Sequence, residues 1–168
     1  MHQEKNLILD KSQVRQKIRR ISYEIFEHNF LEEEVVFAGI YDKGYFLAGM
    51  IADELASISN ISPKLVRVDL DKFSPLQSEV KLDCSVDELV GKPIVLVDDV
   101  LNTGRTLAFS LKPFLNMEVK RIEIAVLVNR GHAQYPVSSK YVGYELSTTI
   151  NEHVEVQLEA DLMNVYLI

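Results

Sequence analysis

Short apolar segments alternate along this chain with longer amphipathic ones. The apolar segments have the length of buried strands and end at polar or turn-forming residues. Four of them are predicted as strands, at residues 35–40, 65–70, 93–97 and 122–128. The segments between them carry apolar residues at helical spacing. Strand alternating with helix predicts an α/β fold with a mainly parallel, twisted sheet and helices on both faces.

Three amphipathic segments are predicted as helices. The first carries apolar residues at helical spacing from 14 to 26, and Asp10 or Ser12 is expected to cap it. The second spans 47–55, and the third spans about 106–115.

Other parts of the chain are less regular. Pro113 is expected to kink or end the third helix early, because proline lacks the N–H that a helix interior needs. Residues 71–90 are polar and mixed, with Pro75 as a strong breaker, and are predicted as either a mobile loop or a small hairpin. Short apolar runs occur near both ends of the chain, at 7–9, 141–143, 154–156 and 165–168.

Length and composition bound the class of protein. The 168 residues fit one domain spanning 1–168, with 47% apolar and 26% charged residues. The net charge of −7 makes the chain a poor general binder of nucleic acid, so RNA is not expected as a partner. Cys84 is the only cysteine, and the histidines show no metal-ligand spacing. No apolar run approaches the ~18 residues of a membrane span, so a cytoplasmic protein without a membrane partner is expected.

A pair of acids follows the third predicted strand. Asp98 and Asp99 come directly after 93–97, and a loop with Gly104 then leads into a helix. Glycine lets the backbone approach a ligand, and the first N–H groups of a helix attract phosphate. Acids beside such a cradle suit a phosphorylated sugar, because they accept hydrogen bonds from ribose hydroxyls. The predicted cradle consists of Asn102, Thr103, Gly104, Arg105 and Thr106.

A simpler interpretation of the same pattern is that the acids only cap the turn. The segment is neither a Walker A loop nor a dinucleotide fingerprint, since it lacks the Gly-Lys-Thr ending and the three-glycine spacing. However, 95–106 resembles the phosphoribosyl pyrophosphate (PRPP) signature of type I phosphoribosyltransferases. The resemblance implies that Asp98 and Asp99 hold the ribose hydroxyls and stabilise positive charge at the anomeric carbon. It also implies that 102–106 binds the 5′-phosphate and that the reaction needs Mg²⁺.

A second loop lies between the strand at 35–40 and the helix after it. It resembles the pyrophosphate loop of the same family, in which backbone N–H groups face the ligand and a non-proline cis peptide is common. The cis bond is expected near Tyr41–Asp42. The loop is alternatively an ordinary strand-to-helix turn with a glycine hinge. The residues assigned to pyrophosphate are Tyr41, Asp42, Lys43 and Gly44.

The C-terminal part resembles the bifunctional pyrimidine-operon attenuation regulators that also act as uracil phosphoribosyltransferases. The likeness rests on 129–136, 140–143 and 148–149, and it implies a small hood over the base. Arg130 is implied to contact a base carbonyl. A looser similarity to purine salvage relatives implies that His153 and Val154 line the base pocket. His132 and His153 are alternatively surface or packing histidines.

The chain also departs from the family pattern. After the second strand the relatives carry a basic-acidic run, whereas this chain has the segment 69–74 there. The loop that follows is shorter than in the family and poor in Arg and Lys. In the family this loop closes over the reaction and excludes water. The departure favours an alternative, a catalytically weak sensor of PRPP or nucleotide that regulates pyrimidine metabolism. A weaker hypothesis is that the helix with Arg15, Arg19 and Arg20 binds RNA.

The leading prediction is an enzyme of nucleotide salvage that forms homo-oligomers, as small relatives do. It transfers a 5-phosphoribosyl group from PRPP to a nucleobase with Mg²⁺ and releases pyrophosphate. Uracil is the first base expected, and a purine is the second. The partners are therefore PRPP and a nucleobase or nucleoside monophosphate, while the metal ligands are unknown.

Overall fold

A six-stranded sheet forms the centre of the computed structural model, which describes residues 4–74 and 79–168. Its strands are β2 (Glu34–Ile40), β3 (Ser62–Asp69), β4 (Lys81–Leu82), β5 (Pro93–Leu101), β6 (Arg121–Asn129) and β7 (Tyr141–Glu145). Their order across the sheet is β4-β3-β2-β5-β6-β7, and only the β3–β4 pair is antiparallel. The predicted α/β fold with a mainly parallel sheet is confirmed.

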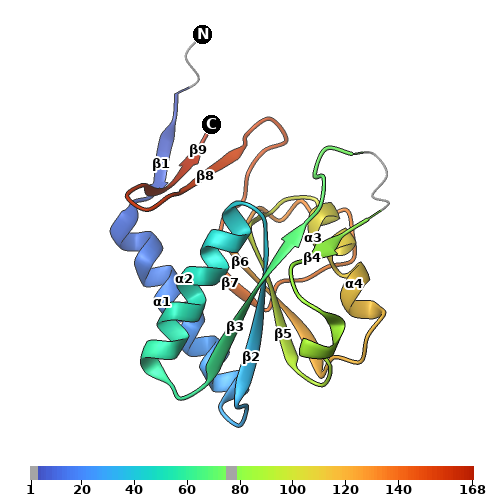
Figure 1. The fold of residues 1–168 in the computed structure, drawn as a ribbon. Coiled ribbons are helices and arrows are strands. Elements are labelled where there is room, and N and C mark those ends of the chain that lie inside the picture. Colours follow the sequence, from blue (N-terminus) through green and yellow to red (C-terminus); the bar gives the residue numbers. More distant parts are fainter. Residues whose placement is uncertain (1–3, 75–78) are drawn as a thin grey trace.

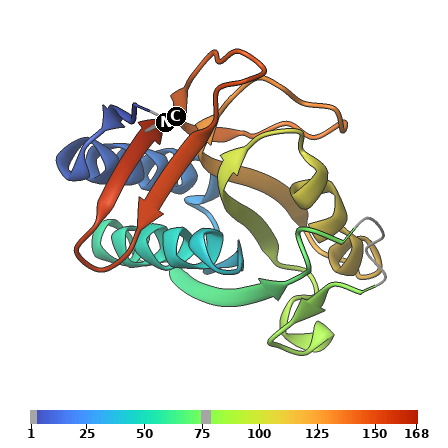
Figure 2. The same cartoon turned by 90° about the horizontal axis from the view of Figure 1, so that it is seen from above.

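Helices cover both faces of this sheet (Figures 1 and 2). The helices α1 (Lys11–Asn29) and α2 (Lys43–Ile58) pack on one face, and α3 (Arg105–Ser110) and α4 (Lys112–Leu115) lie on the other. Strand side chains alternate between the two cores, as the pleat of a strand requires. In β5, Val95 and Val97 belong to the core under α1 and α2, whereas Ile94 and Leu96 belong to the other core.

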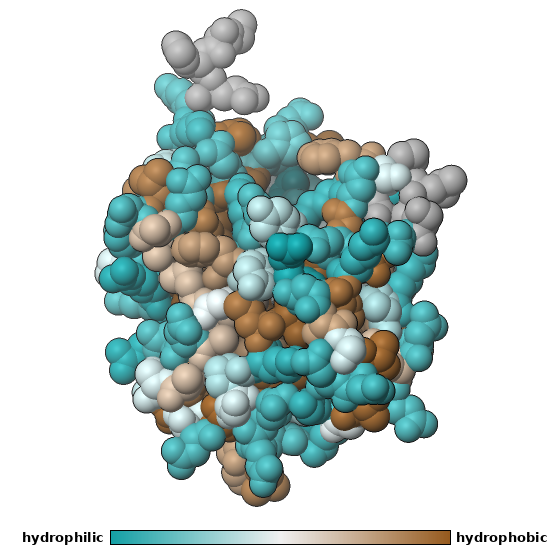
Figure 3. Space-filling model, viewed as in Figure 1, coloured by the Kyte–Doolittle hydropathy of each residue, from teal (hydrophilic) through white to brown (hydrophobic). Residues whose placement is uncertain are grey.

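A small antiparallel sheet forms a hood beside α1 and α2 (Figure 1). It consists of β1 (Asn6–Leu9), β8 (Val154–Leu158) and β9 (Met163–Leu167), in the order β1-β9-β8. The apolar runs at 7–9, 154–156 and 165–168 therefore lie in one sheet, whereas the run at 141–143 belongs to β7 of the central sheet. Most of the side chains on the face shown in Figure 3 are hydrophilic. No helix in the described part of the chain is long and apolar enough to cross a bilayer.

The start of α1 and the break between α3 and α4 follow from their caps and breakers. Asp10 caps α1: its Oδ1 accepts from Gln13 N at 2.9 Å, and Gln13 Oε1 accepts from Asp10 N at 2.9 Å. The predicted third helix is interrupted at Leu111, and Pro113 lies in the first turn of α4. Proline lacks the N–H for a continuous helix, so the predicted kink is confirmed.

The polar segment after β3 forms a hairpin, one of the two structures predicted for it. Val68 pairs with Leu82 and Asp69 with Lys81, while η1 (Val86–Glu88) is a single 3₁₀ turn. Pro75 lies outside the described residues.

The strand β5 is longer than predicted, which corrects the expectation that it ends before the acid pair. On one side its pairing with β2 stops at Val97, opposite Gly39. On the other side its pairing with β6 continues to Leu101, because Val100 and Leu101 are buried apolar residues. The acids therefore lie on an overhang of β5 that extends past its last residue pair with β2.

Candidate functional site

Asp98 lies in a cavity that the predicted phosphate loop also lines. The cavity has a volume of about 120 Å³, and its walls include Asp98, Asp99, Lys72 and 102–106. Asp98 is only 3% exposed, and its Oδ1 accepts a hydrogen bond from Asp99 N at 2.9 Å. The Nζ of Lys72 lies 3.6 Å from the same oxygen. The structure thus brings the acid pair and the loop together, and it adds a lysine that the sequence did not indicate.

Burial raises the pKa of Asp98 well above its usual range, and the neighbouring charge of Asp99 raises it further. The ammonium of Lys72 opposes this shift without cancelling it. A further cation or additional hydrogen-bond donors that approach such a carboxyl favour its ionised form. Ligand binding and ionisation of Asp98 are therefore linked.

The loop after β5 has a conformation that requires glycine. Gly104 has φ of 83°, and a Cβ there would lie 2.5 Å from Val137 Cγ2. The Thr103 hydroxyl accepts from Arg105 N at 3.2 Å, and the Thr103 carbonyl accepts from the N–H groups of 134–135 at 2.7 and 3.0 Å. The segment after β6 therefore fixes the shape of the loop.

The side chain of Arg105 holds the segment that follows β3. Its guanidinium donates to the backbone carbonyls of Lys72 and Ser74, and it lies 4.8 Å from the centre of the Phe109 ring. This contact brings Lys72 next to the acid pair. A role for Arg105 in binding the 5′-phosphate stays a prediction.

The predicted pyrophosphate loop packs directly against the acid pair. The peptide bond between Tyr41 and Asp42 is cis, as expected. A Cβ on Gly44 would lie 2.6 Å from the carbonyl oxygen of Val97 and 3.0 Å from Cα of Asp98. Gly44 has no positive φ, so its role is to permit this close approach, and a hinge is not required.

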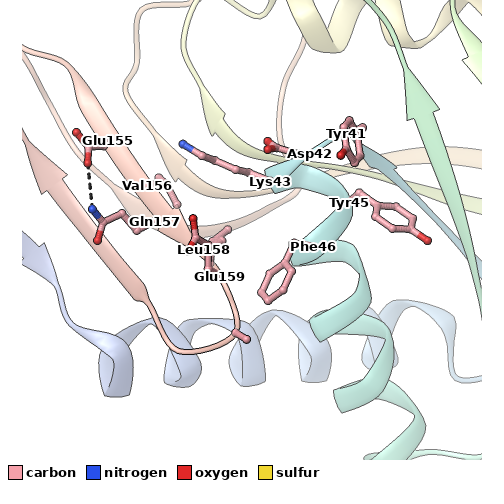
Figure 4. A pocket seen from close by; sticks show the side chains of 11 residues that line it. Tyr41, Asp42, Lys43, Tyr45, Phe46, Glu155, Val156, Gln157, Leu158 and Glu159 are labelled. Atoms are coloured by element: carbon pink, nitrogen blue, oxygen red, sulfur yellow. Dashed lines mark hydrogen bonds between the residues drawn. The ribbon is translucent and has the colours of Figure 1, made fainter.

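A larger hollow of about 620 Å³ lies on the hood side of this loop (Figure 4). Phe46 lines it, and Lys43 extends toward Glu155 of β8. Glu155 already pairs with Lys5 at 2.9 Å and accepts from Gln157 at 3.2 Å. This hollow does not include the acid pair, so the smaller cavity is the better candidate for chemistry.

The predicted base-binding residues occupy two different environments. Arg130 is 8% exposed, and its guanidinium hydrogen-bonds to Asn102 and Thr148. His153 is exposed at the entry to β8, where its backbone exchanges hydrogen bonds of 2.8 and 2.9 Å with Ile168. The half-buried Val154 follows it. Contacts between these residues and a base stay predictions.

The residues that sequence reasoning missed share one property, since each acts through an irregular segment. Lys72 and Glu152 carry no motif, Thr148 belongs to the resemblance but had no role assigned to it, and all three lie outside regular elements. Their importance follows from what they contact, namely Asp98 and Arg130. No signal in the single sequence indicates these pairs.

The basic residues of α1 divide into two groups. Arg20 donates to the backbone carbonyls of Val142 and Gly143 at 2.8 and 2.7 Å, so it joins α1 to β7. Arg19 lies 5.9 Å from the ring centre of Tyr23, and Arg15 is exposed. RNA binding by this helix stays a prediction.

Residues 6–161 match the family model described as the phosphoribosyl transferase domain, and that span contains both predicted loops and the acid pair. The chain belongs to the phosphoribosyltransferase family. Several curated relatives of this phosphoribosyltransferase carry the name Bifunctional protein PyrR. One from Brevibacillus brevis is 34% identical over 96% of this chain and 94% of its own. Another, from Limosilactobacillus reuteri, is 36% identical over 90% of both chains.

Solved structures with the same fold include two purine phosphoribosyltransferases. A hypoxanthine-guanine phosphoribosyltransferase from Bacillus anthracis matches with a TM-score of 0.76 and 16% identity, covering 98% of both chains. The hypoxanthine phosphoribosyltransferase of Trypanosoma cruzi matches with a TM-score of 0.79 and 13% identity, covering 96% of this chain and 95% of its own. At this identity the likeness concerns the fold, which is that of a type I phosphoribosyltransferase.

Proposed function

We propose that this phosphoribosyltransferase transfers the 5-phosphoribosyl group of PRPP to a ring nitrogen of a nucleobase, with Mg²⁺, and releases pyrophosphate. The observation that carries the proposal is the single cavity lined by Asp98, Asp99 and the Gly104 loop. Uracil is the first candidate base, supported by the pyrimidine-regulator resemblance and the relatives named PyrR. A purine is the second, because structural neighbours are named for hypoxanthine and guanine.

Each loop has a distinct role in this proposal. Asp98 and Asp99 accept hydrogen bonds from the ribose hydroxyls and stabilise positive charge as it develops at the anomeric carbon. The loop 102–106 binds the 5′-phosphate, and 41–44 binds the pyrophosphate. Bond breaking runs ahead of bond making, so catalysis depends on positioning and electrostatics and needs no covalent protein nucleophile.

The donor set of the site fits Mg²⁺. This ion prefers oxygen ligands and is commonly held by one or two carboxylates together with substrate phosphates. Asp98 and Asp99 offer such carboxylates, and residues 4–74 and 79–168 contain no cluster of three or more acidic, histidine or cysteine side chains that could hold a metal. The ion would therefore be held jointly by the acids and the substrate. Its chemistry there is to neutralise the charge of the leaving pyrophosphate.

The proposal is tested by incubating the protein with Mg²⁺, PRPP and one base at a time, and by measuring released pyrophosphate. Release that depends on both the protein and one base is expected, with uracil most active. No release with uracil or any purine, from protein that binds PRPP, would contradict the proposed transfer.

A second function, binding of PRPP or nucleotide with little turnover, is favoured by the contact between Lys72 and Asp98. The cavity of about 120 Å³ is smaller than the roughly 300 Å³ at which small-molecule pockets usually begin. An outward movement of Lys72 and the segment held by Arg105 would enlarge this cavity. A protein that binds nucleoside monophosphates in calorimetry and releases no pyrophosphate would support this second function.

A further inference from the structure

Arg130 has almost no exposed surface, and it hydrogen-bonds to two loops that reach the site from different elements. It follows β6 and is 8% exposed. Its Nη1 donates to Oδ1 of Asn102 at 2.9 Å, and its Nε donates to Oγ1 of Thr148 at 3.0 Å. Asn102 begins the predicted phosphate loop, whereas Thr148 lies in the segment that leads into the hood. One guanidinium thus joins the proposed phosphate end of the site to the proposed base end.

The remaining terminal nitrogen of Arg130 fixes the turn before β8. Nη2 donates to the carbonyl oxygens of Thr149, at 3.4 Å, and Glu152. The turn also closes on itself, because Thr149 N donates to Oε2 of Glu152 at 2.6 Å. The predicted base-binding residues 153–154 follow directly, so their position depends on this turn.

The hydrogen-bonding capacity of Arg130 is largely used within the protein. A guanidinium has five N–H donors, and four hydrogen bonds from Arg130 go to protein acceptors. A direct bond to a base would have to use the remaining donor or replace one of these. A buried charged group that loses a hydrogen-bonding partner costs more free energy than an exposed one does. The existing hydrogen bonds of Arg130 therefore resist exchange. The geometry therefore suits a residue that holds loops in place.

We propose that Arg130 is a positioning residue that couples the two ends of the site. A phosphate bound at 102–106 orders Asn102, which orders the Arg130 guanidinium and through it the 148–152 turn. The proposal rests on the proposed function, because it assumes that these loops bind the phosphate and the base of one nucleotide. Coupling of this kind is reciprocal, so a bound base strengthens phosphate binding by the same factor.

The test compares ribose 5-phosphate with uridine 5′-monophosphate, which carries uracil in place of the hydroxyl at the anomeric carbon. The dissociation constant of ribose 5-phosphate divided by that of uridine 5′-monophosphate, measured by calorimetry, reports what the base adds to binding. Arg130→Gln is expected to reduce this ratio at least about fivefold, within the usual range of coupling factors. Arg130→Lys keeps the charge but loses the planar guanidinium that donates to several acceptors at once. Its ratio is therefore expected to stay close to that of Arg130→Gln.

Asn102 separates coupling from direct contact with the base. If Arg130 acts through Asn102, then Asn102→Ala also lowers the ratio, and adding Arg130→Gln to it changes the ratio little further. If Arg130 touches the base directly, Asn102→Ala affects both ligands equally and the ratio is unchanged. An unchanged ratio in Asn102→Ala would overturn the proposal.

Arg20→Gln is the matched control, because Arg20 also donates to two backbone carbonyls but joins α1 to β7. It is expected to lower the melting temperature and to leave the ratio unchanged. Should Arg130→Gln fail to fold, Arg130→Lys and Asn102→Ala still decide the question. Failure of wild-type protein to bind either ligand would refute the proposed function, whereas binding of both with a ratio unaffected by these substitutions would refute only the coupling.

Discussion

The ammonium of Lys72 lies 3.6 Å from Oδ1 of Asp98, a carboxyl that is 3% exposed. The two groups come from different parts of the sheet, since Lys72 follows β3 and Asp98 lies on the overhang of β5. Arg105 holds the backbone of the lysine segment in place. The protein therefore places its own cation beside the acid to which we assign the ribose of PRPP.

Replacement of Lys72 by Met is expected to raise the pKa of Asp98 further. Burial and Asp99 already raise it, and Lys72 is the nearby charge that lowers it. The measurement is a titration of the Asp98 side-chain carboxyl followed by ¹³C NMR. Lys81→Met is the control, because Lys81 pairs with Glu79 at 3.6 Å on the exposed β4 hairpin. An Asp98 titration that is the same in both variants would show that the ion pair is not formed in solution.

Asp98→Asn is expected to stabilise the protein, and increasingly so as the pH rises. The native pKa of Asp98 is raised above the ordinary value, so the unfolded chain loses the Asp98 proton first. Below the ordinary value both states are protonated, and the carboxyl contributes no pH dependence. Above it, ionisation favours the unfolded state until the pH passes the raised native pKa.

Urea unfolding of wild type and Asp98→Asn between about pH 4.5 and 8 measures this effect, with chelator present to remove Mg²⁺. The gap in free energy of unfolding should widen with pH. A gap that stays constant over the range would mean that Asp98 is ionised throughout in the native state.

Gly44→Ala is expected to destabilise the protein by about 1–3 kcal/mol, because the added methyl overpacks the contact with β5. The new Cβ would lie 2.6 Å from a backbone oxygen, which has little freedom to move. Gly49→Ala is the control in the same helix, where the added Cβ would lie 3.8 Å from Leu65 Cδ2 and a gain in helix propensity is expected. The measurement is thermal unfolding of both variants. Equal stability of Gly44→Ala and Gly49→Ala would contradict the packing described for Gly44.

Lys140→Met is expected to lower the free energy of unfolding by about 2 kcal/mol and to leave ligand binding unchanged. Burial raises the pKa of Glu123, but Lys140 and Arg121 outweigh it and lower the pKa overall. Glu123 therefore stabilises the fold above its unfolded pKa, and this stabilisation is lost as the pH falls through the lowered native pKa. Removing Lys140 weakens that contribution. Equal acid sensitivity of wild type and Lys140→Met in urea unfolding would contradict this role.

The sequence was most informative where regular pattern and ligand chemistry coincide. A buried strand, two acids and Gly104 are adjacent in the chain, so their placement at one sheet edge could be predicted. The length of β5 could not be predicted, because two consecutive acids after an apolar run usually indicate that the strand has ended. Pairing of Val100 and Leu101 with β6 carries the strand past them.

Contacts between distant segments could not be predicted from the sequence for a different reason. The bond from Arg130 to Asn102 depends on the parallel register of β5 and β6, which sets Leu101 opposite Asn129. The contact from Lys72 to Asp98 depends on how an irregular segment returns over the sheet. Neither register nor loop path follows from local spacing.

The rate of pyrophosphate release by Asp98→Asn and Asp99→Asn, relative to wild type and with the base that wild type accepts, tests the central claim most directly. Each substitution should reduce the rate by about 10²–10³, the usual cost of removing one group that stabilises developing charge. Melting temperatures equal to or above that of wild type would show that both variants are folded. Folded variants that release pyrophosphate within about twofold of the wild-type rate would contradict the assignment of these two carboxylates to the reacting ribose.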